Sequence, residues 1–231
     1  MKQHVFLFAL AMVFGSVGTG RADPTFIESR LTLKTEAQVL PDPVQYLVSD
    51  RHSTGGYADQ TASATSSSST SNGTAIALAS ARTIWESSKR GQVVFDNIGF
   101  VQAILNPSGM ADVNDSIWYY TFTNGKETEF KLDYAIGIGD STDEIVGIQG
   151  FSFEVDQNGE TVYVQDFDLN SSGTIAVPLD PFQTYTVKII PNGGFQSDDG
   201  LGISSMWGDF AWAIKKSGHD HRIRQHGIGS P

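Results

Sequence analysis

The sequence predicts an all-β protein: a single β-sandwich, jelly-roll-like and built from antiparallel hairpins, that follows a cleaved signal peptide. The first observation is that hydrophobic and polar residues alternate in many short runs, as they do in half-buried strands. The second is that Asn-Gly pairs, which favour tight turns, separate several of these runs. The third is that no long amphipathic helical pattern interrupts them. Together these patterns are typical of two packed sheets.

The first element, residues 1–22, has the composition of a secretory signal peptide. Lys2 precedes an apolar run from Val5 to Phe14, and small residues precede a cleavage site at Asp23. This run is too short to span a bilayer, which requires about 20 residues in a helix. We therefore expect a secreted or extracellular protein without a membrane span, the periplasm and the cell surface being alternatives.

The next elements are a strand and a hairpin. VQYLVS, residues 44–49, reads as a strand between a proline pair and two glycines. The segment TASATSSSSTSNGTAIALASAR, residues 61–82, resembles a serine-rich linker, and its alanines also favour a helix. Its alanines nevertheless alternate with other residues on both sides of Asn72–Gly73, so we predict a hairpin. Its small residues would let another layer approach closely, within one domain.

Stronger strand patterns follow after residue 115. One pair of runs flanks Asn124–Gly125, another flanks Asn158–Gly159, and TIAVPL, QTYTVKII and FAWAI supply three more strands. We expect one sandwich domain over residues 23–214 and a basic, disordered tail over residues 215–231. The residues expected to face inward are Trp118, Tyr120, Phe122, Phe130, Leu132, Tyr134, Ile136, Ile138, Phe151, Phe153, Val155, Val162, Val164, Tyr185, Val187, Ile189, Phe210, Trp212 and Ile214.

This order of strands resembles the ectodomains of bacterial exported proteins of the PEP-CTERM class. The resemblance rests on GFSFEVDQNGETVYV, SSGTIAVPLDPFQTYTVKII and FAWAI, and on the alternating alanine and serine segment. It implies a β-rich exported protein associated with extracellular polysaccharide or biofilm matrix. The chain departs from that class at its end, where KKSGHDHRIRQHGIGSP lacks the Pro-Glu-Pro motif and the apolar span. Anchoring by exosortase is therefore not implied.

The charge and the missing cysteines exclude several functions. The formal net charge is −11, and such a field repels phosphate backbones, so we expect no nucleic-acid partner. The chain has no cysteine, which excludes disulfides, zinc-thiolate sites and a cysteine nucleophile. The sequence does not indicate an oligomeric state.

Catalytic residues are not evident, and we expect no enzymatic activity. His52 is the only histidine between the signal peptide and the tail, and no G-x-S-x-G motif is present. Glu154, Asp156 and Glu160 resemble the acidic strand of bacterial β-glucanases. The turn at Asn158–Gly159 separates Glu160 from the other two acids, however, so we interpret them as a solvated hairpin.

Acidic loops and aromatic residues are the remaining candidates for binding. Asp140, Asp143 and Glu144 could supply oxygen ligands to calcium, although acidic loops in an exported acidic protein are usually just solvated. Trp207, Tyr119 and Tyr163 could offer aromatic faces on which sugar rings stack, or be ordinary core and surface residues.

The sequence thus favours a secreted, non-enzymatic protein of the bacterial envelope or extracellular matrix. It would act by surface contact, with extracellular polysaccharide or a surface protein as its partner. The first alternative is a carbohydrate-binding module, stabilised by calcium or not. A remote alternative is an enzyme that acts on glycans.

Overall fold

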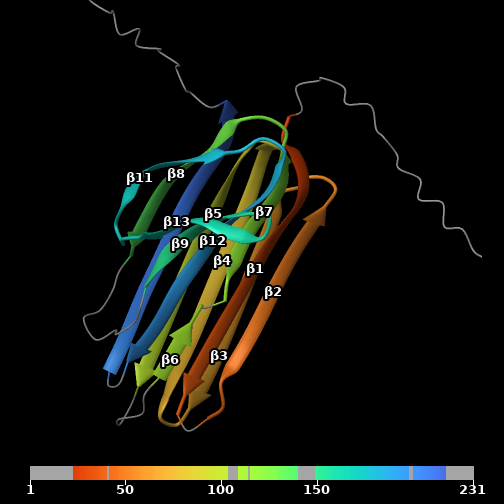
Figure 1. Ribbon diagram of the computed structural model, residues 1–231. Helices are drawn as coiled ribbons and strands as arrows, with labels where there is room; N and C mark the ends of the chain where they lie inside the picture. Colours follow the sequence, from red (N-terminus) through yellow and green to blue (C-terminus); the bar gives the residue numbers. More distant parts are fainter. Residues whose placement is uncertain are drawn as a thin grey trace, which may run out of the picture.

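The computed structural model describes residues 23–40, 42–103, 109–113, 115–139, 149–197 and 200–216, which form two antiparallel sheets packed against each other (Figure 1). The predicted β-sandwich is therefore confirmed. The described part of the chain contains no helix long and apolar enough to cross a membrane. Its strands are β1 (Thr25–Val39), β2 (Gln45–Thr54), β3 (Gln60–Thr70), β4 (Gly73–Ser87), β5 (Arg90–Ala103), β6 (Gly109–Asp112), β7 (Ile117–Asn124), β8 (Thr128–Ile138), β9 (Gln149–Gln157), β10 (Glu160–Phe167), β11 (Ser172–Leu179), β12 (Gln183–Ser197) and β13 (Gly200–Lys216).

The predicted signal peptide lies outside the described residues, and so does the predicted tail from residue 217 onward. The last strand continues to Lys216, two residues beyond the predicted end of the sandwich.

One sheet is seven-stranded, with the order β10-β9-β12-β6-β1-β2, and β7 also pairs with β12 and β1. β6 and β7 share the position between β12 and β1, because β7 pairs with the first half of β1 and β6 with its last residues. The other sheet is six-stranded, with the order β11-β8-β13-β5-β4-β3. β2 and β10 are thus the edges of the first sheet, and β3 and β11 are the edges of the second.

The serine- and alanine-rich segment forms the predicted hairpin of β3 and β4. Thr70 pairs with Gly73, so the turn consists of Ser71 and Asn72, one residue earlier than predicted. The Thr70 hydroxyl stabilises it by accepting a hydrogen bond from the Asn72 backbone N–H at 2.9 Å. The hairpin extends the six-stranded sheet through β5, which confirms that the segment is not a linker.

The two later Asn-Gly pairs behave differently. Asn158 and Gly159, with φ of 53° and 89°, form the tight turn between β9 and β10, as predicted. Asn124–Gly125 does not join paired strands, because β7 and β8 belong to different sheets. The Asn124 side chain instead stabilises the connection from one sheet to the other. It donates a hydrogen bond to the Asp180 carbonyl at 3.0 Å and accepts one from the Thr128 hydroxyl at 3.0 Å.

The space between the sheets has two parts, which lie along the strand direction. The aromatic half consists of closely packed rings: Trp85, Phe95, Trp118, Tyr120, Phe122, Phe130, Phe151, Phe153, Tyr185, Phe210 and Trp212. The alanine–serine half consists of small buried side chains: Thr35, Ala37, Val39, Ser66, Ser68, Ala75, Ala77, Val101 and Ala111.

In the alanine–serine half, side chains of one sheet reach the backbone of the other. The Ser66 hydroxyl donates to the Thr35 carbonyl at 2.8 Å, and the Ser68 hydroxyl accepts from the Val39 backbone N–H at 3.2 Å. The alternation of small residues in β3 therefore has the predicted result that the layers approach closely.

Most residues that we predicted to face inward are buried, but β10 is an exception. Val162 and Val164 are 52% and 55% exposed, which contradicts the prediction. A bulge between Thr161 and Tyr163 shifts the register, so Tyr163 rather than its valine neighbours turns toward the core.

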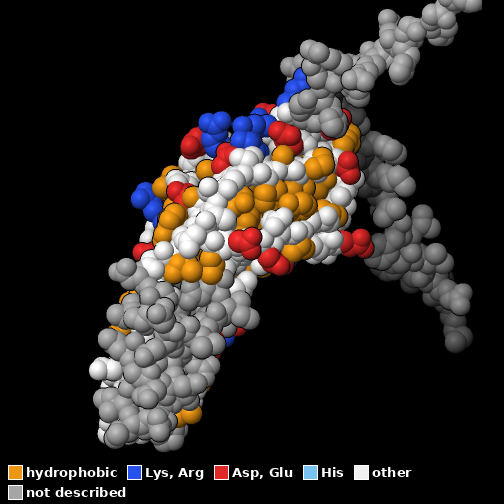
Figure 2. All heavy atoms as spheres, turned by 90° about the vertical axis from the view of Figure 1, so that its left-hand side faces the viewer, with side chains coloured by type: hydrophobic (Ala, Val, Ile, Leu, Met, Phe, Trp, Pro, Cys, Tyr) orange, Lys and Arg blue, Asp and Glu red, His pale blue; other side chains and the backbone are white. Residues whose placement is uncertain are grey.

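Figure 2 shows the side of the molecule at the left of Figure 1, where hydrophobic side chains form a broad area bordered by charged ones. Tyr134 and Ile138 are only half-buried.

Candidate functional site

Trp207 lies on the outer face of the six-stranded sheet. Its neighbours in β13, Met206 and Phe210, point into the core, and alternation along the strand directs Trp207 outward. The Trp207 side chain is 42% exposed, whereas the other three tryptophans are buried.

A glycine on the adjacent strand accommodates the indole. Gly137 of β8 lies directly opposite Trp207, and a Cβ on Gly137 would lie 2.4–2.5 Å from three atoms of the ring. The indole therefore packs directly against the Gly137 backbone, while 42% of the Trp207 side chain remains exposed to solvent. Aromatic side chains cover a cross-strand glycine in this way in other sheets, which protects the backbone from water.

Polar side chains surround the exposed face of the indole. Asp96 lies opposite Trp207 on β5, and Gln92, further along β5, donates to Asp209 Oδ1 at 2.6 Å. We call Gln92, Asp96, Trp207 and Asp209 the Trp207 surface. It combines one flat aromatic group with hydrogen-bonding groups held by neighbouring strands, which is the composition of a site for a polar ligand with apolar faces.

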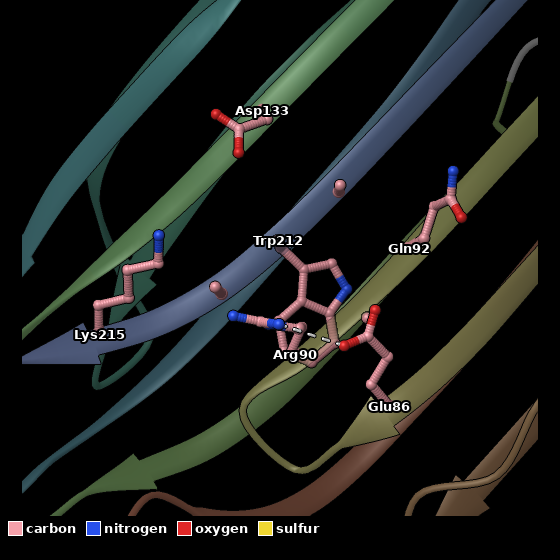
Figure 3. Close-up of a pocket in the computed structure, with 9 residues that line it drawn as sticks. Glu86, Arg90, Gln92, Asp133, Trp212 and Lys215 are labelled. Atoms are coloured by element: carbon pink, nitrogen blue, oxygen red, sulfur yellow. Dashed lines mark hydrogen bonds and ion pairs between the residues drawn. The ribbon is translucent and has the colours of Figure 1, made fainter.

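A shallow hollow of about 310 Å³ lies on the same outer face, closer to the end of β13 (Figure 3). Ala211 and Ala213 leave space there because they are the smallest outward side chains of β13. Gln92 belongs both to the hollow and to the Trp207 surface, so the two are continuous. Trp207 and Ala211 are four residues apart on one strand, a distance of about 13 Å.

The hollow carries charges of both signs. Glu86 pairs with Arg90 at 3.5 Å, and Asp133 lies near Lys215 on the other side. The pKa of Asp133 lies below its usual range because the Thr174 hydroxyl and then the Lys131 ammonium stabilise the carboxylate. The hollow therefore presents both hydrogen-bond donors and acceptors, and it does not select strongly for a charged ligand.

Tyr119 lies on the opposite side of the molecule, on the outer face of the seven-stranded sheet. It is half-buried between its cross-strand neighbours Arg30 and Lys188, and burial raises the pKa of its hydroxyl. Tyr119 and Trp207 thus face away from each other, and the structure does not combine them in one site.

The acids of the predicted hairpin lie on the same face as Tyr119. Lys188 Nζ contacts Glu154 Oε2 at 3.1 Å and Asp156 Oδ2 at 2.7 Å, and Glu160 begins the returning strand. The two carboxylates are therefore neutralised in part by one ammonium group. Neither belongs to the hollow described above.

Tyr163 does not form an exposed aromatic surface. Its ring lies 5.9 Å from that of Phe153 and packs against the core at the β10 edge. The bulge in β10 directs it there, so sugar stacking on Tyr163 is not supported by its position.

The calcium candidates Asp140, Asp143 and Glu144 lie outside the described residues. Within the described ranges, no three histidine, aspartate or glutamate side chains group closely enough to hold a metal ion. His52, the histidine of the predicted domain, pairs instead with Glu28 at 3.0 Å on the surface.

The hollow is not among the sites predicted from the sequence, although one local pattern indicates it. The run Asp209–Lys216 alternates large inward residues with Ala211 and Ala213, which predicts a low outer surface. The charged rim comes from β4, β5 and β8 as well, and their alignment with β13 depends on long-range pairing.

No protein-family model matches this chain, and neither does any curated protein. Among solved structures, the chain has a partial likeness to the crystal structure of the GH31 alpha-xylosidase from Xanthomonas citri. The identity is 10%, and the alignment covers 78% of this chain and 33% of that one. The TM-score is 0.18, too low to carry any argument about fold or function.

Proposed function

We propose that this protein is a secreted, non-enzymatic β-sandwich of the bacterial envelope or extracellular matrix that binds neutral polysaccharide on the Trp207 surface. The observation that carries the proposal is the position of Trp207, whose indole packs against Gly137 on an outer sheet face while 42% of its side chain stays exposed. The C–H faces of a sugar ring pack well on such a surface, because aromatic faces are apolar and electron-rich. A ring already held by the sheet loses little conformational freedom on binding.

The surrounding groups fit a chain of sugars rather than an apolar ligand. Sugar hydroxyls both donate and accept hydrogen bonds, so they can satisfy Asp96, Gln92 and Asp209. The continuous hollow offers further donors and acceptors, including Arg90 and Asp133, to neighbouring sugar units. A neutral polymer is favoured over an acidic one, because the protein carries a formal charge of −11 and two carboxylates flank the indole.

A binding role without catalysis agrees with the arrangement of the acids. Hydrolysis of a glycosidic bond requires two carboxyl groups flanking a bound sugar, one of them protonated. Glu154 and Asp156 instead lie on an open sheet face, where both contact the same lysine.

Affinity electrophoresis tests the proposal directly. The protein is run through native gels that contain neutral glucans, mannans, xylans or galactans, and we expect at least one polymer to slow it. Trp207→Ala should weaken this retardation by about tenfold or more, since truncating a tryptophan that anchors a binding surface typically costs about 2 kcal/mol or more. Phe182→Ala is the matched control, because Phe182 is 82% exposed between β11 and β12 and does not line the hollow. Repeating the gels with chelator tests the calcium proposal.

Two measurements keep the test independent of folding defects. Thermal unfolding compares the stability of each variant, and Asp96→Ala alters the same surface without uncovering Gly137. Acrylamide quenching reports on Trp207 itself, since it is the exposed member of the four tryptophans. A retarding polymer should protect it from quenching. Unchanged mobility in every gel, or retardation that survives Trp207→Ala, would refute polysaccharide binding at this surface.

A further inference from the structure

The free edge of the seven-stranded sheet is formed by β2, whose outer backbone groups have no strand partner among the described residues. The Gly55 N–H donates to the Ile27 carbonyl at 3.0 Å, which fixes the hydrogen-bonding pattern of the β1–β2 pair. Odd-numbered residues of β2 therefore bond to β1, and even-numbered residues direct N–H and C=O away from it. Tyr46 and Val48 thus present backbone donors and acceptors that face away from β1, whereas the Asp50 carbonyl accepts a hydrogen bond from the Arg51 side chain at 3.0 Å.

The side chains of this edge are apolar on both faces. Tyr46 and Val48, on the outer face, are 71% and 51% exposed, and Leu47, on the inner face, is 46% exposed. No charged residue occurs between Val44 and Ser49, and the pairing with β1 continues without a bulge. Soluble proteins usually protect an edge with charge, proline or a bulge, and the first half of β2 has none of these within it.

Two of the other three edges carry such protection, and the third is polar. β10 has the bulge at Val162, and a two-fold pairing about Tyr163 would place Glu160 opposite Asp166 of a second copy. β11 contains Pro178, and the outward residues of β3 are serine and threonine. The edge of β2 is therefore distinct in composition, since it is apolar and lacks charge, proline and a bulge in its first half.

We propose that β2 pairs antiparallel with β2 of a second copy of this chain, joining two seven-stranded sheets edge to edge. A two-fold axis at Leu47 satisfies the backbone pattern, because it places Tyr46 opposite Val48 of the other copy, and both residues have free backbone groups. The same register places Leu47 beside Leu47 on the inner face. It opposes no two like charges along β2. The strand is thus complementary to itself, as a two-fold interface requires.

Cysteine cross-linking tests the register, since the natural chain contains no cysteine. Leu47→Cys should form a covalent dimer rapidly on mild oxidation, because residues directly opposite in a non-hydrogen-bonded pair have Cα atoms about 4.5 Å apart, within disulfide range. Gln45→Cys should not form such a dimer, because in this register the side chains at position 45 of the two copies would lie about 13 Å apart along the strands. Val164→Cys, exposed on the β10 edge, is the control for random collision. Cross-linking of Leu47→Cys that is no faster than that of either control would overturn the proposal.

Sedimentation velocity over a range of concentrations tests the association itself. Val48→Pro removes an N–H that points away from β1, so it should leave the β1–β2 pair intact and raise the dimer Kd by about tenfold or more. Val162→Lys on β10 should leave the Kd unchanged. Val48→Lys, which adds charge without altering the backbone, should weaken the dimer as well. A protein that stays monomeric at all concentrations, or a dimer that both Val48 variants leave intact, would exclude pairing through β2.

Discussion

The aromatic half and the alanine–serine half close the same sandwich by opposite means. Rings such as Trp212 and Trp118, whose centroids lie 6.2 Å apart, fill the space between the sheets in the first half. In the second half, Ser66 bonds directly to the Thr35 backbone of the other sheet. Sheets commonly pack about 10 Å apart, with side chains filling the layer between them. The difference teaches that alternation decides which residues enter the core, whereas their size decides how closely the sheets approach.

The stability of the two halves should therefore depend on side-chain size in opposite ways. Removing volume leaves a cavity where rings fill the layer, and adding volume forces the sheets apart where alanines fill it. Hydrogen bonds from side chains as short as serine to the backbone of the other sheet should matter in the alanine–serine half, where the distance permits them.

The largest effect is expected for Trp212→Ala, which should lower the free energy of unfolding by about 3–5 kcal/mol. Trp212 is 1% exposed and contacts the rings of Trp85, Tyr120 and Phe130. Urea unfolding measures the change. Trp207→Ala, on the outer face of the same strand, should cost clearly less. Equal losses for the two variants would mean that the aromatic half does not depend on ring packing.

Enlarging the alanine–serine half is expected to cost about 1–3 kcal/mol in Ala77→Leu. Ala77 is fully buried in the layer where the sheets lie close, so the added atoms must displace a strand or adopt a strained rotamer. Ser80→Leu enlarges an exposed position on the same strand and should stay within about 0.5 kcal/mol of the parent. Stabilisation by Ala77→Leu would show that this half contains unfilled space and would remove the contrast.

The hydrogen bonds between the layers are tested by Ser66→Ala, which should cost about 1–3 kcal/mol because it leaves buried groups of Thr35 without a partner. Ser67→Ala is the matched control, since Ser67 is the next residue in β3 and is exposed. Its stability should equal that of the parent. If both serines behave alike in urea unfolding, the contacts between β3 and β1 contribute nothing measurable.

Alternation in the sequence was sufficient to predict strands and most of their inner faces, because the period of two holds whatever a strand pairs with. It failed at Val162, where the bulge adds a residue that no local pattern announces. The Asn-Gly signal was correct at Asn158–Gly159 but misleading at Asn124–Gly125. Both pairs favour a turn, and only tertiary packing decides whether the flanking strands pair with each other.

For the candidate site, the sequence could place Trp207 on an outer face by its parity with Met206 and Phe210. It could not place Gly137 beneath the indole, since that contact depends on the register between β8 and β13. The hollow depends on the alignment of still more strands. Tyr119 had the same local appearance as Trp207, yet it lies on the other sheet, because the sequence pattern does not indicate sheet membership.

The smallest expected effect is an alkaline loss of stability that originates in the aromatic half. Burial raises the pKa of Tyr120 above its ordinary value of about 10, and its hydroxyl donates to the Ser88 carbonyl at 2.6 Å. The unfolded chain therefore releases this proton first as pH rises. The stability that the protonated Tyr120 hydroxyl contributes is fully present below about pH 10. It is lost as the pH rises from about 10 to the raised pKa of the folded state.

Tyr120→Phe should consequently cost about 1 kcal/mol at pH 7 through the lost hydrogen bond, yet lose stability less steeply between about pH 10 and 11. Urea unfolding at both pH values gives the slope, and Ser66→Ala should keep the slope of the parent because it alters no ionisable group. Burial also raises the pKa of Tyr185, so part of the alkaline loss of stability should remain in the Tyr120→Phe variant. An unchanged slope in Tyr120→Phe would mean that alkaline sensitivity arises outside the aromatic half.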